Sequence, residues 1–151
     1  MSSYIDYKYN YHGVKLINKS IVRKRYELRP PDPGDSNNYW KILKNVISKQ
    51  IKKPNPIVVP VHKFNFKIQK DGTVKYTYDM SRCELLTREE EEVINKYWAD
   101  NESTLRDWGS KYKKLFRFLK KVNKSSYMDL HLGNIMKYRD NYVLIDLEGF
   151  L

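Results

Sequence analysis

The order in which strand-like and helix-like patterns follow one another most limits what this chain can fold into. Alternating apolar and polar residues indicate strands, whereas apolar residues three and four positions apart indicate helices. The strand-like stretches are 4–28, 57–68, 73–80 and a final hairpin from Ile135 to Asp146, and the helix-like stretches are 39–53, a segment after Thr87, and 104–123. This order predicts an α+β protein with a sheet-rich first half and a helical second half.

Short turn and capping motifs predict where several of these elements begin and end. His12-Gly13 and Asn18-Lys19 are turn sequences within the first stretch, so we expect a three-stranded meander there. Lys70-Asp71-Gly72 is typical of a hairpin turn. Thr87 is expected to cap the helix that follows it, with glutamates in the first turn. Gly109 disfavours the middle of the last helix, so a break is possible there.

The charge balance limits the class of partner without selecting one. The 151 residues include 29 Lys and Arg against 18 Asp and Glu, which gives a formal net charge of +11. A field of this sign attracts nucleotides, nucleic acids and acidic protein surfaces. The abundance of Lys, Asn and Tyr would suit a compact viral or mobile-element genome.

The remaining composition points to a reducing compartment. The single cysteine, Cys83, excludes an intramolecular disulfide and a cysteine-based zinc cluster, and we expect it to be a packing residue. No signal-peptide-like segment opens the sequence, and no apolar run approaches the roughly 20 residues that span a bilayer. We therefore expect a cytoplasmic protein without membrane contact.

Three oxygen-bearing side chains in the last third of the chain carry the clearest chemical signal. Asp129 and Asn134 lie on one predicted loop, and Asp146 ends an apolar strand, where an unpaired buried carboxylate would be costly. Mg²⁺ takes oxygen ligands and keeps waters and phosphates in its shell. We expect Asn134 and Asp146 to share such an ion, and Asp129 to orient or deprotonate an acceptor hydroxyl. The alternative is that Asp129 and Asn134 are turn residues and Asp146 caps a strand.

These residues belong to a segment that resembles the protein-kinase-like superfamily, most closely the DLHxGN loop of its aminoglycoside- and choline-kinase-like branches. The positions at family spacing are Asp129, Leu130, His131, Gly133 and Asn134, followed by Leu144-Ile145-Asp146. The resemblance implies phosphate transfer from ATP with Mg²⁺. It also implies that Asp129 is the catalytic aspartate, that His131 lies near the transferred phosphate, and that Asn134 and Asp146 are metal ligands.

The same resemblance extends less specifically over the rest of the chain. It implies a β-rich N-lobe at 1–80, and a hinge with a short helical C-lobe at 81–151 that is truncated after the metal-binding strand. Lys24 lies on the apolar face of its predicted strand and matches the family's phosphate-binding lysine, although it could instead be an edge lysine. Gly13 offers one glycine to the phosphate-covering turn. The backbone at Asp79, Met80 and Ser81 resembles the hinge that binds adenine.

The sequence departs from the family at several positions. Helix 39–53 contains no glutamate to pair with the phosphate-binding lysine. The candidate substitutes are Glu27 and Asp35, or the neutral Gln50 and Asn45. Tyr127 stands where the family usually has histidine, which we expect to weaken one structural hydrogen bond. The sequence ends two residues after Gly149, so we expect the helices that bind the acceptor to be absent.

Three functional hypotheses remain open from the sequence. The first is an active small kinase whose acceptor is a hydroxyl, on a protein or a small molecule. The second is a kinase-like binding or inhibitory module whose basic helices, 41–53 and 111–124, dock an acidic partner protein. The third is a nucleic-acid-binding protein in which the same helices follow a phosphate backbone.

Overall fold

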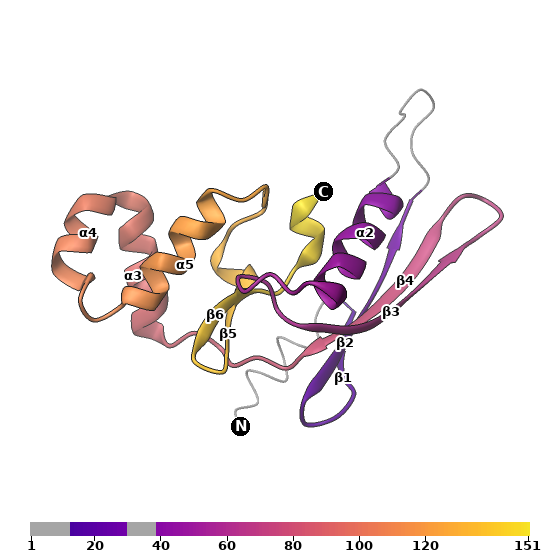
Figure 1. Cartoon of the computed structure of the whole chain (residues 1–151), viewed down its shortest axis with the longest axis horizontal. Helices are drawn as coiled ribbons and strands as arrows, with labels where there is room; N and C mark the ends of the chain where they lie inside the picture. The colour runs from indigo at the N-terminus through magenta and orange to yellow at the C-terminus, as the bar shows by residue number, and fades with distance from the viewer. Residues whose placement is uncertain (1–12, 30–38) are drawn as a thin grey trace.

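The computed structural model describes residues 13–29 and 39–151, and its mixed α+β architecture confirms the predicted fold class at that level (Figure 1). The strands are β1 (Val14–Leu16), β2 (Ile21–Leu28), β3 (Val61–Ile68), β4 (Val74–Ser81), β5 (Ile135–Tyr138) and β6 (Asn141–Leu144). The helices are α2 (Tyr39–Lys52), α3 (Arg88–Ala99), α4 (Asn101–Trp108) and α5 (Lys113–Asn123), with short 3₁₀ helices η1 (Leu132–Asn134) and η2 (Leu147–Phe150).

The first half of the chain forms an antiparallel sheet with strand order β1-β2-β4-β3. The predicted turn before β2 is confirmed, because the Asn18 side chain accepts hydrogen bonds from the amides of Ser20 and Ile21. The central pairing joins β2 to β4 and places Lys24 opposite Tyr78. The remaining strand of the expected meander, before Gly13, lies outside the described residues.

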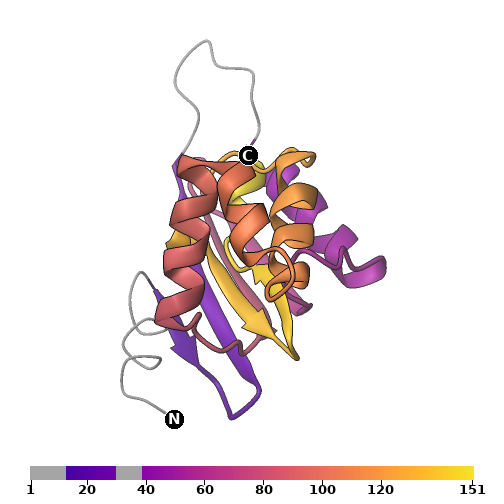
Figure 2. The same ribbon diagram turned by 90° about the vertical axis from the view of Figure 1, so that its left-hand side faces the viewer.

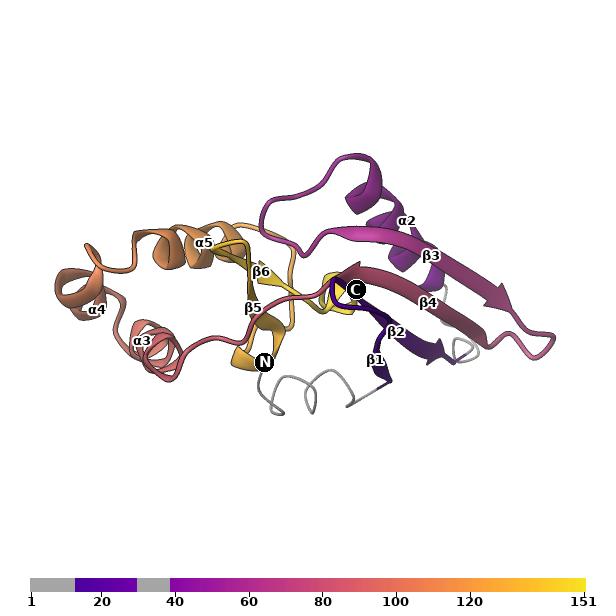
Figure 3. The ribbon, with the colours of Figure 1, turned by 90° about the horizontal axis from the view of Figure 1, so that it is seen from below.

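Helix α2 covers the sheet with the apolar stripe that the sequence predicted, and Leu43 and Ile47 are fully buried (Figure 3). Burying a side chain of this size contributes about 1.5–3 kcal/mol. The buried Gln50 accepts a hydrogen bond from the amide of Asn55 and donates to the carbonyls of Val58 and Val59. Gln50 therefore fastens the loop after α2 to the helix.

The expected strand 57–68 is shorter than predicted, because β3 begins only at Val61. The amide of Val59 donates to Leu144 O at 2.9 Å, and the amide of Leu144 donates to Ile57 O at 2.8 Å. Residues 57–59 therefore pair with the end of β6 instead of β4. This pairing ties the first half of the chain to the C-terminal hairpin.

The predicted start of α3 is confirmed. The Thr87 hydroxyl accepts a hydrogen bond from the amide of Glu90, whose carboxylate in turn accepts one from the amide of Thr87. Glu90 also accepts hydrogen bonds from Lys137, at 2.9 Å, and from the Tyr142 hydroxyl. The cap therefore joins α3 to the β5–β6 hairpin.

The helical stretch expected over 104–123 is interrupted at the point where Gly109 made a break possible, and the chain forms two helices that separate after Trp108. The break coincides with Gly109, where a side chain would come within 2.3 Å of Leu105 O. Lys111 and Tyr112 both turn toward Glu89 of α3, at 2.5 and 2.6 Å. These contacts take Leu105 out of the expected apolar stripe and leave it exposed.

One cluster of buried apolar side chains runs through both halves of the molecule. Figure 3 shows α3, α4 and α5 at one end, the large sheet with α2 at the other, and the β5–β6 hairpin with η2 between them. Figure 2 views the molecule from the helical end. None of the described helices combines the length and apolar character that a membrane span requires.

Candidate functional site

Lys24 on β2 forms an ion-pair cluster with the segment that follows β6. Its ammonium group donates to Asp146 Oδ1 at 3.0 Å and to Glu148 Oε2 at 2.7 Å, across 122 and 124 positions of sequence. The side chains of Lys24, Asp146 and Glu148 are 13, 27 and 16 % exposed. Lys24 is therefore a half-buried, doubly paired residue of the sheet face, and the alternative of an edge lysine is wrong.

Glu148 also accepts hydrogen bonds from two tyrosines of β4. The hydroxyl of Tyr76 donates to Oε1 at 2.5 Å and that of Tyr78 to Oε2 at 3.0 Å. Burial raises the pKa of both phenols and the charge of Glu148 raises it further, so both remain donors. The sequence contained one indication that these two tyrosines act together. Tyr76 and Tyr78 share a strand face, but the pairing that brings Lys24 to that face is not encoded locally.

The pKa values of the two carboxyls of this cluster shift in opposite directions. Burial raises the pKa of Glu148, and its hydrogen bond with Asp146 raises it further. Burial would also raise the pKa of Asp146, but its hydrogen bond with Glu148 and the charge of Lys24 outweigh burial and lower it. Burial would lower the pKa of Lys24, but the two carboxylates raise it overall. Lys24 therefore remains protonated and paired with both carboxyls.

The predicted catalytic loop forms a compact turn around η1. The side-chain amide of Asn134 donates to Asp129 O at 2.8 Å and to Asp129 Oδ2 at 3.2 Å. His131 accepts a hydrogen bond from the Gly133 amide through Nδ1 at 3.1 Å, and its Nε2 lies 3.7 Å from Asp129 Oδ2. Asn134 is buried, whereas the side chains of Asp129 and His131 are more than half exposed. Asp129 is therefore fixed in orientation and still accessible.

Tyr127 connects this loop to Asp146. Its buried hydroxyl donates to the carbonyl of Asp146 at 2.8 Å, and the hydroxyl also interacts with the Asn134 side chain. Burial raises the pKa of Tyr127, and the charges of Asp146 and Asp129 raise it further. The expectation that tyrosine weakens a structural hydrogen bond at this position is wrong, because Tyr127 makes one directly.

Backbone hydrogen bonds hold the same two segments together. The amide of Met128 donates to Gly149 O at 2.7 Å, and the amide of Ile145 donates to Asn134 O at 3.0 Å. Gly149 lies against the ring of Tyr127, where a Cβ would come within 2.3 Å of two ring carbons. The segments that carry Asp129, Asn134 and Asp146 are thus linked through Tyr127 and Gly149.

We expect Gly149→Ala to lower the free energy of unfolding by about 1–3 kcal/mol, the usual cost of overpacking a filled site. The added methyl group must displace the buried Tyr127 ring and weaken its hydrogen bond to Asp146. Urea unfolding followed by circular dichroism measures the change.

Gly133→Ala is the matched control for this substitution. Its Cβ would meet only the ring of His131, an exposed side chain that can rotate away. We expect a smaller loss in the free energy of unfolding, below about 0.5 kcal/mol, which is the ordinary range for a surface substitution. Equal losses in the two variants would contradict the tight packing of Gly149 on Tyr127.

The predicted cofactor-binding residues Asp79, Met80 and Ser81 lie at the end of the central strand β4. Asp79 is buried, and its two carboxylate oxygens accept hydrogen bonds from Arg23 Nε at 2.6 Å and Nη2 at 3.0 Å. Its side chain therefore stabilises the pairing of β2 with β4. Met80 is buried, and the amide of Ser81 donates to Pro60 O. Base binding at this backbone stays a prediction.

Gly13 stands at the start of β1, where its carbonyl accepts a hydrogen bond from the amide of Arg25 at 2.9 Å. Its φ is +75°, and a Cβ would come within 2.5 Å of Arg25 O, so glycine is required there. The structure therefore gives Gly13 a role in extending the β1–β2 pairing at the end away from its turn. A role in covering phosphate stays a prediction.

Glu148 takes the position beside Lys24 for which the helix glutamate was missing. Among the substitutes considered, Glu27 pairs with Lys75, Asn45 is exposed on α2, and Gln50 holds the loop after α2. Asp35 lies outside the described residues. The sequence therefore pointed to the need for an acid beside Lys24 but not to the residue that supplies it.

The donor set near Asp146 suits a hard cation only in combination with other oxygen ligands. In the part of the chain that the structure describes, no group of three or more His, Cys, Asp and Glu side chains is arranged to hold a metal. One carboxylate and one amide oxygen fit Mg²⁺, which is often bound by one or two carboxylates together with substrate phosphates. Lys24 already balances Asp146, so the cost of burying this carboxylate does not by itself require a metal.

Comparisons with known proteins add no assignment, because the chain matches no protein-family model and no curated protein. The function of the protein is therefore inferred from the side chains and the geometry of the site itself.

Proposed function

We propose that this protein is a small phosphotransferase of the protein-kinase-like type, which binds Mg·ATP and transfers the γ-phosphate to a hydroxyl. One observation carries the proposal: Lys24 of the sheet bonds Asp146, and Tyr127 links Asp146 to the loop of Asp129 and Asn134. Four residues with separate roles in phosphoryl transfer, Lys24, Asp129, Asn134 and Asp146, thus converge from both halves of the chain.

In this proposal the residues divide the work of a phosphoryl transfer. The acceptor oxygen forms a bond to the γ-phosphorus, the bond from that phosphorus to the β–γ bridging oxygen breaks, and ADP leaves. Asp129 orients the hydroxyl and takes its proton, a role that suits an accessible carboxylate held by Asn134. Lys24 neutralises phosphate charge, and His131 lies beside Asp129 toward solvent.

Asn134 and Asp146 are the residues that would hold Mg²⁺ in this scheme. The ion would neutralise phosphate oxygens. The lowered pKa of Asp146 keeps its carboxylate charged and so suits it to a cation. Glu148 holds Lys24 in place in the role of the absent helix glutamate.

The lobes of this fold would follow the proposed division at 1–80 and 81–151. The sheet with α2 would form the first lobe, and α3–α5 with the β5–β6 hairpin the second. We favour a protein acceptor, because the net charge of +11 attracts acidic surfaces.

A kinase-like binding module without transfer is the second candidate. Lys24 bonds Asp146 and Glu148 at once, so both carboxylates of this cluster have a cationic partner without a nucleotide. In such a module the surface would bind a partner and Asp129 would have no catalytic task. Measuring nucleotide binding and phosphate transfer separately distinguishes the two candidates.

Thermal unfolding with ATP, in the presence and absence of Mg²⁺, tests the proposal. At ATP concentrations near 100 times the dissociation constant, we expect the melting temperature to rise by about 5–10 °C with Mg²⁺. Asp146→Asn should abolish most of this rise, because it removes a charged oxygen ligand. Asp107→Asn, an exposed carboxylate of α4, should leave the rise unchanged.

Transfer of the labelled γ-phosphate to proteins of a lysate then separates the two candidates. Nucleotide-induced stabilisation with transfer supports the phosphotransferase, and stabilisation without transfer supports the binding module. The absence of any Mg²⁺-dependent stabilisation would refute the phosphotransferase and leave the binding module, which needs no nucleotide.

A further inference from the structure

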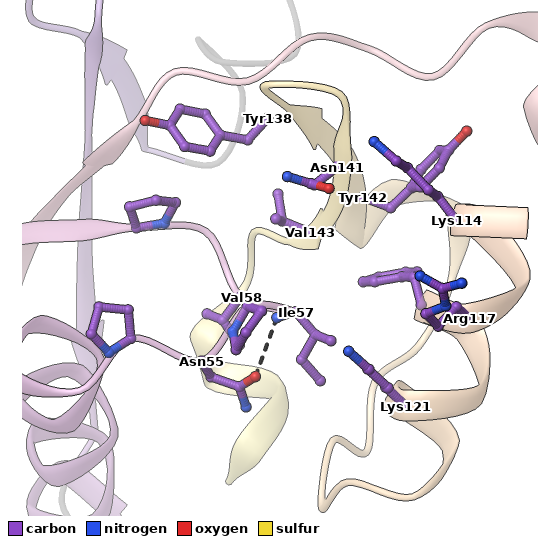
Figure 4. Close-up of a pocket in the computed structure, with 14 residues that line it drawn as sticks. Asn55, Ile57, Val58, Lys114, Arg117, Lys121, Tyr138, Asn141, Tyr142 and Val143 are labelled. Atoms are coloured by element: carbon purple, nitrogen blue, oxygen red, sulfur yellow. Dashed lines mark hydrogen bonds between the residues drawn. The ribbon is translucent and has the colours of Figure 1, made fainter.

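A second feature of the molecule lies away from the Lys24 cluster, in a groove between α5, the loop 54–60 and the β5–β6 hairpin (Figure 4). The groove has a volume of about 360 Å³. One wall is the face of α5 that carries Lys114, Arg117 and Lys121. Figure 4 shows Lys114 and Lys121 extending from this helix toward the hairpin and the loop.

The cationic wall has no acidic counterpart. The residues that line the groove include no Asp or Glu. Within the described parts of the chain, Lys114, Arg117 and Lys121 form no ion pair, whereas Lys111 and Lys137 nearby are paired with Glu89 and Glu90. All three side chains are exposed. A ligand with negative charges could therefore bind them without displacing an internal partner.

The opposite wall is apolar. The accessible part of it is formed by Pro54, Pro56 and Pro60, and the buried Ile57, Val58 and Val143 lie beneath. The loop is held in this conformation by Gln50 and by its pairing with Leu144, so the wall is a fixed part of the fold. A ligand that fits must therefore be acidic along one side and apolar along the other.

We propose that this groove docks an extended acidic segment of a partner protein, in which Asp or Glu alternates with aliphatic residues. Successive side chains of an extended peptide point to opposite sides, so such a segment presents acids to α5 and aliphatic groups to Pro54 and Pro56. Residues 114 and 121 are separated by about 10 Å along the helix, which matches three or four residues of extended peptide.

The aromatic residues of the groove favour a peptide over single-stranded nucleic acid. Nucleic acids that bind without base readout stack their bases on open aromatic faces. The Tyr142 ring packs beside Phe118 and its hydroxyl donates to Glu90, and Arg139 lies over the Tyr138 ring. Both tyrosines thus have partners within the protein. The proposal does not depend on the phosphotransferase function.

Fluorescence anisotropy of a labelled ten-residue peptide with Glu alternating with Leu and Val tests the proposal on the intact protein. The groove variant carries Lys114→Glu, Arg117→Glu and Lys121→Glu. The control variant carries Lys19→Glu, Lys67→Glu and Lys70→Glu, which reverses the same number of exposed charges on the strands and turns of the large sheet, at residues that do not line the groove. Circular dichroism verifies that each variant is folded, and a version with Gln at the three groove positions serves as a milder second variant.

We expect the groove variant to bind at least about tenfold more weakly than the wild type, and the control variant to lose less than about threefold. Peptides with Gln for Glu, or with Ser for the aliphatic residues, should also bind at least about tenfold more weakly. Equal losses in both variants would show charge attraction without a site and overturn the proposal. Undiminished binding of the Ser peptide, tighter binding of a ten-nucleotide single strand, or no binding of the Glu–aliphatic peptide would also overturn it.

Discussion

Asp129→Asn should lower the rate of phosphate transfer by about 10²–10⁴-fold, the usual contribution of a general acid or base. Asparagine has the same shape as aspartate but cannot take the hydroxyl proton. The carboxylate is held by the Asn134 amide, at 3.2 Å, and is largely exposed, so its replacement should leave the fold intact. Transfer of labelled phosphate under saturating Mg·ATP measures the rate.

The same variant should still bind nucleotide. Asp129 is proposed to act on the acceptor, so the Mg·ATP-dependent rise in melting temperature should stay close to that of the wild type. A loss of stabilisation together with transfer would place Asp129 among the ligands of the nucleotide complex instead.

Asp140→Asn is the matched control for Asp129→Asn. Asp140 is exposed in the β5–β6 turn with a φ of 65°, a conformation that asparagine adopts as readily as aspartate. Its replacement should change transfer by less than about twofold, since it removes a charge far from the reacting groups. Transfer that continues at the wild-type rate in Asp129→Asn would refute a catalytic role for this aspartate.

Elements with local signals were predictable from the sequence. The Thr87 capping box fixed the start of α3, and the apolar stripe of α2 predicted which residues are buried. Asn18 set the turn before β2 through its own side chain. Each of these signals depends on residues within one or two turns of chain, where spacing and hydrogen-bonding chemistry are readable.

Features that depend on distant partners were not predictable. The loop at 57–59 has strand-like composition, but its partner is Leu144, and only the folded chain shows which strand it joins. The break before α5 is stabilised by contacts of Lys111 and Tyr112 with Glu89 on another helix. Gly109 makes a break possible, but the residues that stabilise it come from another helix and could not be read from the local sequence.

The candidate site also contains residues that could be predicted from the sequence and one that could not. Asp129, Asn134 and Asp146 could be named from their spacing, and the structure joins them through Tyr127 and Gly149. Glu148 could not be assigned to Lys24, because their contact depends on the β2–β4 pairing and on η2 at the far end of the chain.

Glu148→Ala should lower the free energy of unfolding by about 2–5 kcal/mol. Its carboxylate accepts from the ammonium of Lys24 and from the hydroxyls of Tyr76 and Tyr78, all of them largely buried. Alanine leaves the two hydroxyls without this acceptor and Lys24 with Asp146 alone. Urea unfolding monitored by tryptophan fluorescence and circular dichroism measures the loss.

Two control variants test whether the loss of stability in Glu148→Ala comes from its contacts with Lys24, Tyr76 and Tyr78. Glu148→Gln keeps an acceptor oxygen of similar size and should cost only about 1 kcal/mol. Glu84→Ala removes an exposed carboxylate elsewhere in the chain and should change stability by less than about 0.5 kcal/mol. Equal effects of Glu148→Ala and Glu84→Ala would contradict the buried cluster.

A double-mutant cycle with Tyr76→Phe tests whether the interaction is direct. Tyr76→Phe removes one donor to Glu148 and leaves the ring that packs parallel to Tyr78, with centroids 6.2 Å apart. Once Glu148 is alanine, the Tyr76 hydroxyl is already unpaired, so its further removal should cost nothing or restore stability. We expect a coupling energy of about 0.5–3 kcal/mol. Strict additivity would mean that Glu148 stabilises the protein through Lys24 without the tyrosines, and the sheet face would then hold the lysine by ion pairing alone.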